Sequence, residues 1–236
     1  MDKKIRKAQK DVLKIFSRHA KNFALSGGTA LEIYYLKHRF SVDLDFFSPG
    51  YNIKEIDLLV KEFEKDLKTK IKFEHELKQA DKARVRFYSM PVDGALRPLK
   101  IDFVEDVIFQ EPHIENFEGV RVYAADNIYL QKLIAVTGTR PAVDEIGREI
   151  LRGRVEARDA FDIYMLSNKI EPLSVFLKRS PGHIQRGMVQ WYRRFSRMDL
   201  KLALLDLDIY SDKFDPKEMI MYLEKEIEKF IREEVK

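Results

Sequence analysis

The sequence predicts an α+β fold, in which a mixed, largely antiparallel sheet flanked by helices is followed by a helical C-terminal lobe. Several short segments before residue 124 alternate apolar and polar residues, which is typical of half-buried strands. From Asp126 onward, apolar residues instead recur with the period of a helix. We therefore expect an α/β domain over 1–124 and a helical domain over 125–236.

The first domain should begin with a helix over 4–20, because its apolar residues fall roughly on one helical face. The same criteria predict strands at 23–25, 42–47, 70–77, 83–88 and 99–104, and helices at 29–37 and 53–67. In the second domain they predict only helices, at 126–136, 155–166, 184–195 and 216–235. The roughly twenty residues between Val136 and Arg158 are expected to add a helix or a loop.

The composition is that of a globular protein, and it excludes several classes of site. With 45% hydrophobic and 35% charged residues over 236 positions, the chain can bury a core. No apolar run approaches the length of a membrane span, so we expect no membrane contact. The chain has no cysteine, which excludes thiolate zinc sites and cysteine nucleophiles and fits a cytoplasmic protein.

A glycine-rich turn opens the segment 27–47, which carries most of the functional information. Gly27 and Gly28 allow the backbone to approach a ligand closely, and Thr29 begins a predicted helix. Free N–H groups, the helix dipole and a hydroxyl at the helix start together favour a phosphate. The alternative is an ordinary glycine turn in which Thr29 only caps the helix.

Carboxylates follow this turn on predicted strands. Alternation places Asp43 and Asp45 on one strand face, where they repel each other unless a cation lies between them. Oxygen ligands of this kind suit Mg²⁺. A third carboxylate, Asp102, interrupts the apolar strand 99–104, as a two-metal phosphoryl-transfer site requires. The alternatives are an exposed strand face for the first pair and a surface ion pair between Asp102 and Lys100.

The order of these motifs resembles the polymerase β-like nucleotidyltransferase superfamily, and more closely the AbiEii/AbiGii toxin family of type IV toxin–antitoxin systems. The resemblance runs over residues 25–166, and no motif is matched from 170 to 236. It rests on five blocks in family order, which are Gly27-Gly28-Thr29-Ala30-Leu31, His38-Arg39-x-Ser41-x-Asp43-Leu44-Asp45-Phe46-Phe47, Lys100-Ile101-Asp102-Phe103, Asp126-x5-Lys132-Leu133-x-Ala135, and Arg158-Asp159-x-x-Asp162-Ile163-Tyr164-x-Leu166.

The resemblance implies a nucleotide site and a metal site for this chain. The residues that it places against the nucleotide are Gly27, Gly28, Thr29, Arg39, Ser41 and Lys132. The carboxylates that it assigns to Mg²⁺, or Mn²⁺, are Asp43, Asp45 and Asp102.

The resemblance also implies catalytic roles beyond the metal carboxylates. Lys132 would contact the phosphates of the nucleotide. Asp159 is the preferred candidate for the aspartate that the family links to activity, and Asp162 is the second candidate. Arg158 would have a supporting role. The alternatives are a solvated Lys132 and an intrahelical ion pair between Arg158 and Asp162. Arg39, taken by itself, could hold a phosphate or the ribose, or could pair with an acid of the sheet.

A basic stretch between 178 and 201 interleaves arginines with aromatic residues. This pattern suits the backbone and the unstacked bases of RNA. The candidate RNA contacts are Arg186, Arg193, Arg194 and Arg197. The alternative is an amphipathic helix that buries its aromatic residues and solvates its arginines.

Together with the resemblance, these motifs predict a Mg²⁺-dependent nucleotidyltransferase that moves an NMP from an NTP to an acceptor hydroxyl and releases pyrophosphate. The resemblance implies a toxin-type enzyme that modifies the 3′ end of tRNA. It also implies a cognate antitoxin that is encoded nearby and need not bind the toxin directly. The alternatives are transfer to a protein or to a small molecule such as an antibiotic, and a non-catalytic nucleotide- or RNA-binding module.

Overall fold

The chain folds into two compact units. The computed structural model describes residues 2–78, 83–138, 141–143, 149–151, 153–154 and 156–234. One unit, here called the sheet unit, comprises Met1–Tyr35 and Phe40–Asn127. The other, here called the helical unit, comprises Leu36–Arg39 and Ile128–Lys236. A short stretch of the N-terminal half therefore belongs to the helical unit.

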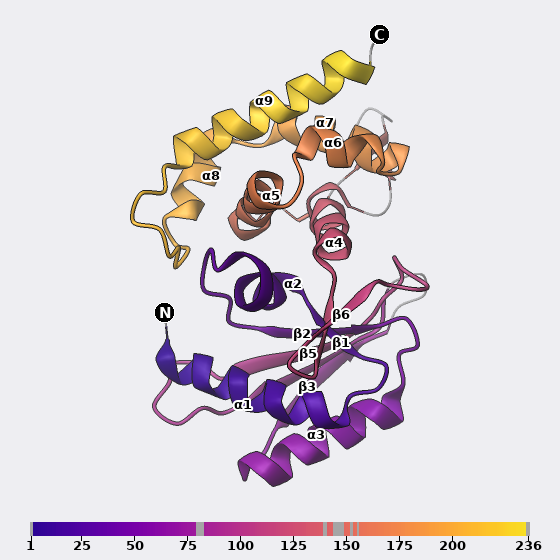
Figure 1. Cartoon of the computed structure of the whole chain (residues 1–236), viewed down its shortest axis with the longest axis vertical. Helices are drawn as coiled ribbons and strands as arrows, with labels where there is room; N and C mark the ends of the chain where they lie inside the picture. Colours follow the sequence, from indigo (N-terminus) through magenta and orange to yellow (C-terminus); the bar gives the residue numbers. More distant parts are fainter. Residues whose placement is uncertain are drawn as a thin grey trace. The chain divides into compact units, whose positions relative to one another are not determined.

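The sheet unit is built on one mixed sheet (Figure 1). Its strands are β1 (Ala24–Ser26), β2 (Leu44–Ser48), β3 (Lys72–Leu77), β4 (Val85–Met90), β5 (Leu99–Glu105), β6 (Ile114–Phe117) and β7 (Val120–Tyr123). They lie in the order β3-β4-β5-β2-β1-β7-β6. The β2–β5 and β1–β7 pairs are parallel, and the other neighbouring pairs are antiparallel. The predicted mixed, largely antiparallel sheet is confirmed.

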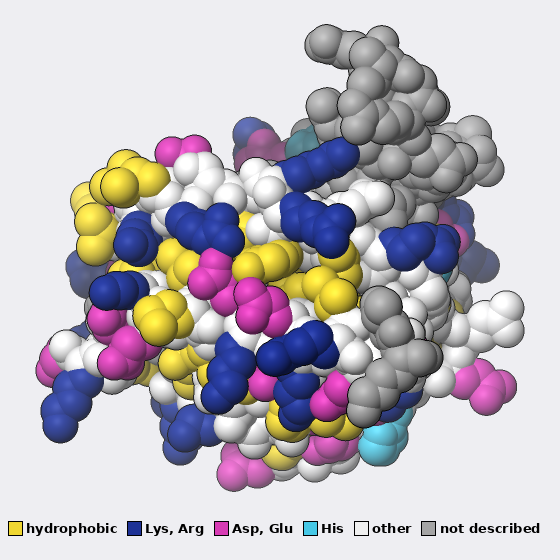
Figure 2. Space-filling model, turned by 90° about the horizontal axis from the view of Figure 1, so that it is seen from above, with side chains coloured by type: hydrophobic (Ala, Val, Ile, Leu, Met, Phe, Trp, Pro, Cys, Tyr) yellow, Lys and Arg dark blue, Asp and Glu magenta, His cyan; other side chains and the backbone are white. Residues whose placement is uncertain are grey.

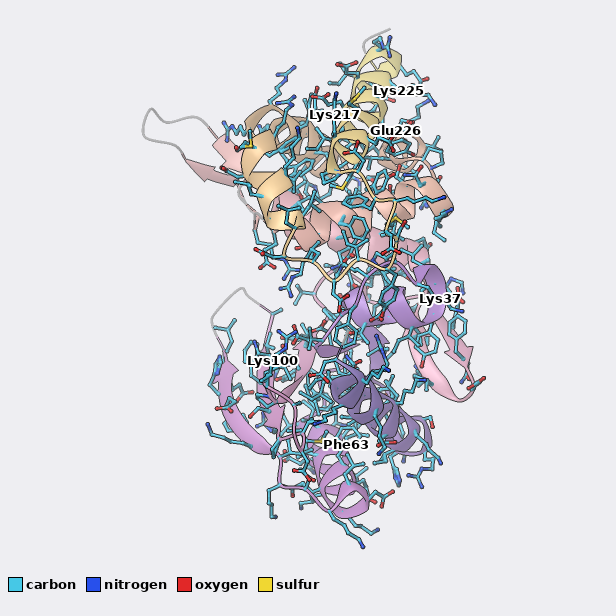
Figure 3. All side chains as sticks on the ribbon, turned by 90° about the vertical axis from the view of Figure 1, so that its left-hand side faces the viewer. Lys37, Phe63, Lys100, Lys217, Lys225 and Glu226 are labelled. Atoms are coloured by element: carbon cyan, nitrogen blue, oxygen red, sulfur yellow. The ribbon has the colours of Figure 1, made fainter. Side chains whose placement is uncertain are left out.

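Two helices, α1 (Lys3–His19) and α3 (Ile53–Leu67), pack against each other below the sheet in Figure 1. Their apolar residues recur at helical spacing, so each helix buries a single face. Phe16 of α1 stacks on Phe46 of β2 with ring centroids 4.1 Å apart. Phe63 of α3, labelled in Figure 3, is fully buried. The core thus lies between these helices and one face of the sheet.

The single helix predicted for 29–37 is wrong in detail. The structure has a short helix, α2 (Gly27–Ala30), that continues as a π-helix, η1 (Leu31–Leu36). Lys37 follows with φ 49°, in the left-handed region, and ends the helical run. Apolar periodicity does not distinguish a π-helix from an α-helix over so few residues, and π-helical turns frequently mark functional sites.

The structure contains two hairpins that the sequence pattern does not predict. Strands β6 and β7 are joined by Glu118 and Gly119, which both have positive φ. In the helical unit, β8 (Pro141–Val143) pairs with β9 (Glu149–Leu151). The sequence predicts only helices after residue 125, with an added helix or loop between Val136 and Arg158. This prediction is wrong for the residues that form β8 and β9. Strands of three or four residues are too short for alternation to be recognised.

The rest of the helical unit consists of helices. They are α4 (Ala125–Thr137), whose first turn belongs to the sheet unit, α5 (Ala157–Lys169), α6 (Leu173–Lys178), α7 (Gly182–Arg194), α8 (Arg197–Leu204) and α9 (Pro216–Glu234). Helix α9 packs against α5, α6, α7 and α8 and supplies buried side chains such as Leu223 and Ile227. The predicted helical C-terminal lobe is confirmed. Of the helices that the structure describes, none is both long and apolar enough to cross a membrane.

Candidate active site

The turn between β1 and α2 brings the backbone against a carboxylate. Gly27 has φ 72°, in the left-handed region that favours glycine. A Cβ atom at this position would lie 2.6 Å from Oδ2 of Asp45, so any side chain here would displace that carboxylate. Position 27 therefore favours glycine for its backbone conformation, and glycine leaves the Asp45 carboxylate where it is. The predicted phosphate turn lies directly beside one of the predicted metal carboxylates.

Thr29 and Ser41 hold the loop that carries Asp43. Thr29 is fully buried, and its hydroxyl donates a hydrogen bond to the backbone carbonyl of Asp43. The helix cap is Ser26, so Thr29 does not take the capping role that was the alternative. The N–H group of Ser41 donates to Oε2 of Glu32 at 2.8 Å. Both residues thus fix the entry of the chain into β2.

Asp45 and Asp102 lie side by side on neighbouring parallel strands. They are register partners in the β2–β5 pair, so their side chains leave the same face of the sheet. The alternate residues Phe46 and Phe103 are fully buried on the face that contacts the helices. Asp43 lies one residue before β2 and not within a strand, because the strand begins at Leu44 rather than at residue 42.

The electrostatics of this group are dominated by burial and by repulsion between like charges. Burial raises the pKa of the Asp102 carboxyl to about 7, and the negative charges of Asp45 and Asp43 add to the shift. Lys100, labelled in Figure 3, lowers the pKa of Asp102 but does not outweigh the burial. Asp102 is therefore not a simple surface partner of Lys100.

The donor set fits a divalent cation chemically. Carboxylate oxygens are the ligands that Mg²⁺ prefers, and a cation would remove the repulsion that raises the pKa of Asp102. Within the described part of the chain, no three acidic or histidine side chains form a ready metal cluster. Asp43, Asp45 and Asp102 are the carboxylates that would hold such a cation.

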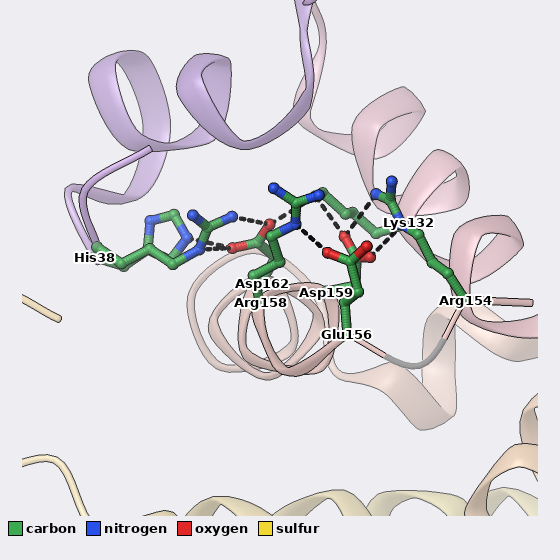
Figure 4. A network of polar contacts seen from close by, with 8 residues as sticks. His38, Lys132, Arg154, Glu156, Arg158, Asp159 and Asp162 are labelled. Atoms are coloured by element: carbon green, nitrogen blue, oxygen red, sulfur yellow. Dashed lines mark hydrogen bonds and ion pairs between the residues drawn. The ribbon is translucent and has the colours of Figure 1, made fainter. Parts of the chain in front are cut away.

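A second group of charged side chains surrounds α5 inside the helical unit (Figure 4). Arg39 donates to Asp162 through Nε at 2.7 Å and through its NH2 nitrogen at 2.8 Å. Nε2 of His38 lies 2.7 Å from Oδ1 of the same carboxylate. Nζ of Lys132 lies 2.8 Å from Oδ1 of Asp159 and 2.7 Å from Oδ2 of Asp162. Arg39, Lys132, Asp159 and Asp162, four of the predicted site residues, thus form one network.

Both carboxylates of this network are fully buried and remain ionised. Burial alone would raise the pKa of Asp159, but Lys132 and Arg154 outweigh it and hold the pKa below its usual value. In the same way, Lys132 and Arg39 hold the pKa of Asp162 well below its usual value. The negative charges of Asp159 and Asp162 are therefore balanced by cations in direct contact with them. The ammonium of Lys132 contacts both carboxylates, which fix its orientation.

Comparison with protein families decides the identity of this arrangement. The family described as nucleotidyl transferase AbiEii toxin, type IV TA system, matches residues 11–233. The chain belongs to the AbiEii toxin family. It is therefore a nucleotidyltransferase, and nucleotidyltransferases of this family generally use divalent metal ions and an NTP. The type IV system implies an antitoxin as partner. A search of curated proteins finds no match.

Two solved structures share the fold of this AbiEii-family chain. JHP933 from Helicobacter pylori aligns with a TM-score of 0.58 at 20% identity, over 97% of this chain and 93% of that one. A candidate nucleotidyltransferase from H. pylori aligns with a TM-score of 0.60 at 19% identity, over 98% of each chain. At this level of identity, the comparisons support the fold.

His38, which belongs to the second motif block, and Arg154, which the sequence does not single out, complete the network of the AbiEii-family protein. Arg154 donates to Asp159 through Nε at 2.5 Å and through its NH2 nitrogen at 3.0 Å. It lies just outside the predicted motif blocks, so no sequence signal marks it. Arg158 instead lies with Nε 2.5 Å from Oε2 of Glu156, with both side chains about 40% exposed. Arg39 pairs with Asp162, an acid of α5.

The candidate RNA-contacting arginines lie on α7 and at the start of α8. Arg186 and Arg193 line one side of a groove of about 360 Å³ beside Phe230 of α9. Arg194 ends α7, whereas Arg197 pairs with Glu224 at 2.5 Å and lies over the rings of Tyr192 and Phe195. Figure 2 shows Lys and Arg side chains spread over one face among hydrophobic and acidic ones.

The raised pKa of Asp102 predicts a pH dependence of stability. Because the folded pKa of about 7 exceeds the ordinary value of 3.8, the folded protein takes up a proton that the unfolded chain releases. The stabilising contribution of Asp102 is therefore full below pH 3.8 and is lost as the pH rises to about 7. Asp102→Asn should remove this loss, which is up to about 4 kcal/mol at about 1.36 kcal/mol per pKa unit.

The measurement is urea denaturation of both proteins in EDTA, at about pH 5 and about pH 8. Asp93→Asn, in an exposed turn, serves as the control and should keep the slope of the parent protein. An equal loss of stability with pH in the parent and in Asp102→Asn would show that Asp102 does not titrate in this range.

Proposed function

We propose that this AbiEii-family enzyme moves an NMP from an NTP to an acceptor hydroxyl with release of pyrophosphate, in a Mg²⁺-dependent reaction. We propose the 3′ end of tRNA as the acceptor, with growth arrest as the consequence for the cell. These substrates make the cytoplasm the expected compartment. The cognate antitoxin is expected to be encoded nearby and need not contact the enzyme.

One observation carries the proposal, namely the placement of Asp45 and Asp102 as register partners with Gly27 against them. A backbone turn without a side chain can admit a phosphate chain close to the carboxylates. Two carboxylates on adjacent strands, with Asp43 beside them, can hold Mg²⁺, with Mn²⁺ as an alternative. When bound there, the metal ion would supply a Lewis acid that stabilises charge on the phosphates.

The protein's own groups perform the remaining tasks in this proposal. The backbone of Gly27 and Gly28, with Thr29 behind them, positions the triphosphate. The ammonium of Lys132 has three donors, of which two can be directed at Asp159 and Asp162, so that one remains for a phosphate oxygen.

Several predicted residues are carried in the same proposal with narrower roles. Asp159 is the preferred catalytic partner of Lys132, and Asp162 and Arg158 support it. Arg39 and Ser41 are proposed to act on the nucleotide indirectly. Arg39 holds Asp162 of α5, and Ser41 holds the chain that leads into β2. We likewise propose that residues 1–124 act as the nucleotidyltransferase domain and residues 125–236 as the helical domain.

The test is a labelling assay with purified protein, each α-³²P-labelled NTP, Mg²⁺ and total tRNA. Label is expected on RNA with the parent protein and is expected to be absent with the Asp43→Asn/Asp45→Asn variant. The labelled NTP that works names the base. Failure of every NTP to label any acceptor, in protein that is folded, would contradict the proposal.

The identity of the acceptor is tested in two ways, by which molecule becomes labelled and by charge reversal in the basic stretch 178–201. Label on protein alone would favour a protein acceptor, and label on an added small molecule would favour an antibiotic-type transferase. Reversing the charges of Arg193 and Arg194 to Glu should weaken the labelling of tRNA and leave transfer to a small molecule unchanged. Nucleotide binding without any transfer would favour a non-catalytic binding module.

A further inference from the structure

The helical unit contains a cavity of about 500 Å³ that the proposed transfer reaction does not use. Its walls come from three segments of this unit, which are α5, the stretch 209–215 before α9, and the short stretch 36–39. Tyr210 donates its N–H group to the carbonyl of His38 at 3.1 Å, which ties two of these segments together. The volume lies within the range of pockets that bind small molecules.

Aromatic side chains form one wall of this cavity. The rings of Phe161 and Phe214 lie edge to face, with centroids 4.9 Å apart, and Tyr164 lies 6.4 Å from Phe214. Phe214 and Tyr164 are half-buried, so part of each side chain remains open. Aromatic side chains in such a position provide stacking surfaces for a planar ring. Any of the four nucleobases can stack on them, because each base has a π-face.

Exposed lysines surround the opening. Lys37, Lys169 and Lys213 all line the cavity and are exposed, whereas the acids that line it are Asp215 and Glu218. Lys37, labelled in Figure 3, has a left-handed backbone and directly follows the π-helix η1. Both features are uncommon and tend to occur where a functional site requires them. The lysines suit an anionic group on the ligand.

Polar side chains complete the lining of the cavity. Asn168 and Ser211 both line it and are exposed. Amide and hydroxyl groups can donate hydrogen bonds to, and accept them from, the polar edge of a base. His38 also belongs to the wall, but its side chain is fully buried and its Nε2 is engaged by Asp162 at 2.7 Å.

We propose that this cavity binds a nucleotide, with its base against Phe214 and Tyr164, the polar edge of the base at Asn168 and Ser211, and its phosphate near the lysines. The ring, the hydrogen-bonding edge and the anion are the three features that the cavity can recognise together. The nucleotide could come from two sources, a free mononucleotide or the 3′-terminal nucleotide of an RNA. The inference does not depend on transfer chemistry at Asp45 and Asp102, because it concerns binding alone.

The test measures binding to the full-length protein in EDTA, so that metal-dependent binding at the carboxylates is suppressed. The probes are AMP, GMP, CMP and UMP, and a short single-stranded RNA with a free 3′ end, followed by calorimetry or fluorescence anisotropy. We expect Phe214→Ala to weaken binding by about tenfold or more, because one stacking surface is lost. Phe214→Tyr, which keeps the ring, and Asp93→Asn, in an exposed turn of the sheet unit, should bind as the parent protein does.

The outcomes separate this inference from the proposed reaction. Binding of a mononucleotide that Phe214→Ala abolishes supports the cavity and names a free nucleotide as the source. Binding of the RNA alone, with the same sensitivity, supports the cavity and names the RNA terminus. Equal binding by Phe214→Ala and the parent, with unchanged thermal unfolding, overturns the inference. The absence of binding by the parent to every probe overturns it as well.

Discussion

Replacement of Asp45 by Asn is expected to lower the rate of NMP transfer by about a thousandfold or more, without lowering the stability of the fold. Asn keeps the shape of the side chain but removes the charge that would hold a divalent cation beside Asp102. The same change removes a negative charge that raises the pKa of Asp102, so it relieves repulsion in the folded protein. A loss of activity with equal or higher stability is therefore the signature of this site.

The measurement combines the rate of label transfer from the active α-³²P NTP with the temperature of thermal unfolding. Asp11→Asn is the matched control, because the side chain of Asp11 is 41% exposed and pairs with Lys7 on the same helix. This control should keep both the rate and the stability of the parent protein. Retention of the parent rate by Asp45→Asn would exclude the carboxylate as a metal ligand, and a fall in unfolding temperature would indicate a structural role instead.

Replacement of Asp162 by Asn is expected to destabilise the protein by about 3–5 kcal/mol, because it removes a buried negative charge that two buried cations contact directly. Arg39 and Lys132 are both about 95% buried and both contact this carboxylate directly. Urea denaturation measures the loss. Glu156→Gln is the matched control on the neighbouring turn, where the ion pair with Arg158 is about 40% exposed. It should cost less than about 1 kcal/mol.

The same carboxylate gives a second signature at acid pH. Its pKa lies well below the ordinary value of 3.8, so its stabilising contribution is present above that value and is lost as the pH falls through the folded pKa. The parent protein should therefore lose stability in this acid range, and Asp162→Asn should lose less of it. An equal acid slope in the two proteins, or a destabilisation no larger than that of Glu156→Gln, would show that the cations have other partners.

The sequence was sufficient for the parts of the fold and the site that depend on local pattern. Asp45 and Asp102 could be assigned to strands from alternation, and Gly27 could be assigned to a turn from its composition. Their adjacency depends on the parallel pairing of β2 and β5, which the sequence pattern does not predict and the structure describes. The close approach of Gly27 to Asp45 is a tertiary fact that no local pattern encodes.

The remaining features depend on contacts between distant parts of the chain. Arg39 and Asp162 are 123 positions apart, so their pairing leaves no periodic signal in the sequence. Arg154 lies between elements and is brought to Asp159 by the local path of the chain. The β6–β7 hairpin was missed because its strands span four residues each and its turn at Glu118-Gly119 lacks the usual Asn or Asp.

Residues 36–39 belong to the helical unit, which has a consequence for folding during synthesis and for expression of the protein as fragments. His38 and Arg39 leave the ribosome long before α5, yet their carboxylate partner is on that helix. The sheet unit can begin to fold during synthesis while this short stretch stays without its partner. A fragment that starts at Ile128 would lack His38 and Arg39, two of the side chains that contact Asp162. Expression of the two halves as separate chains should therefore fail, and a helical fragment should become stable only when a peptide covering 36–39 is supplied.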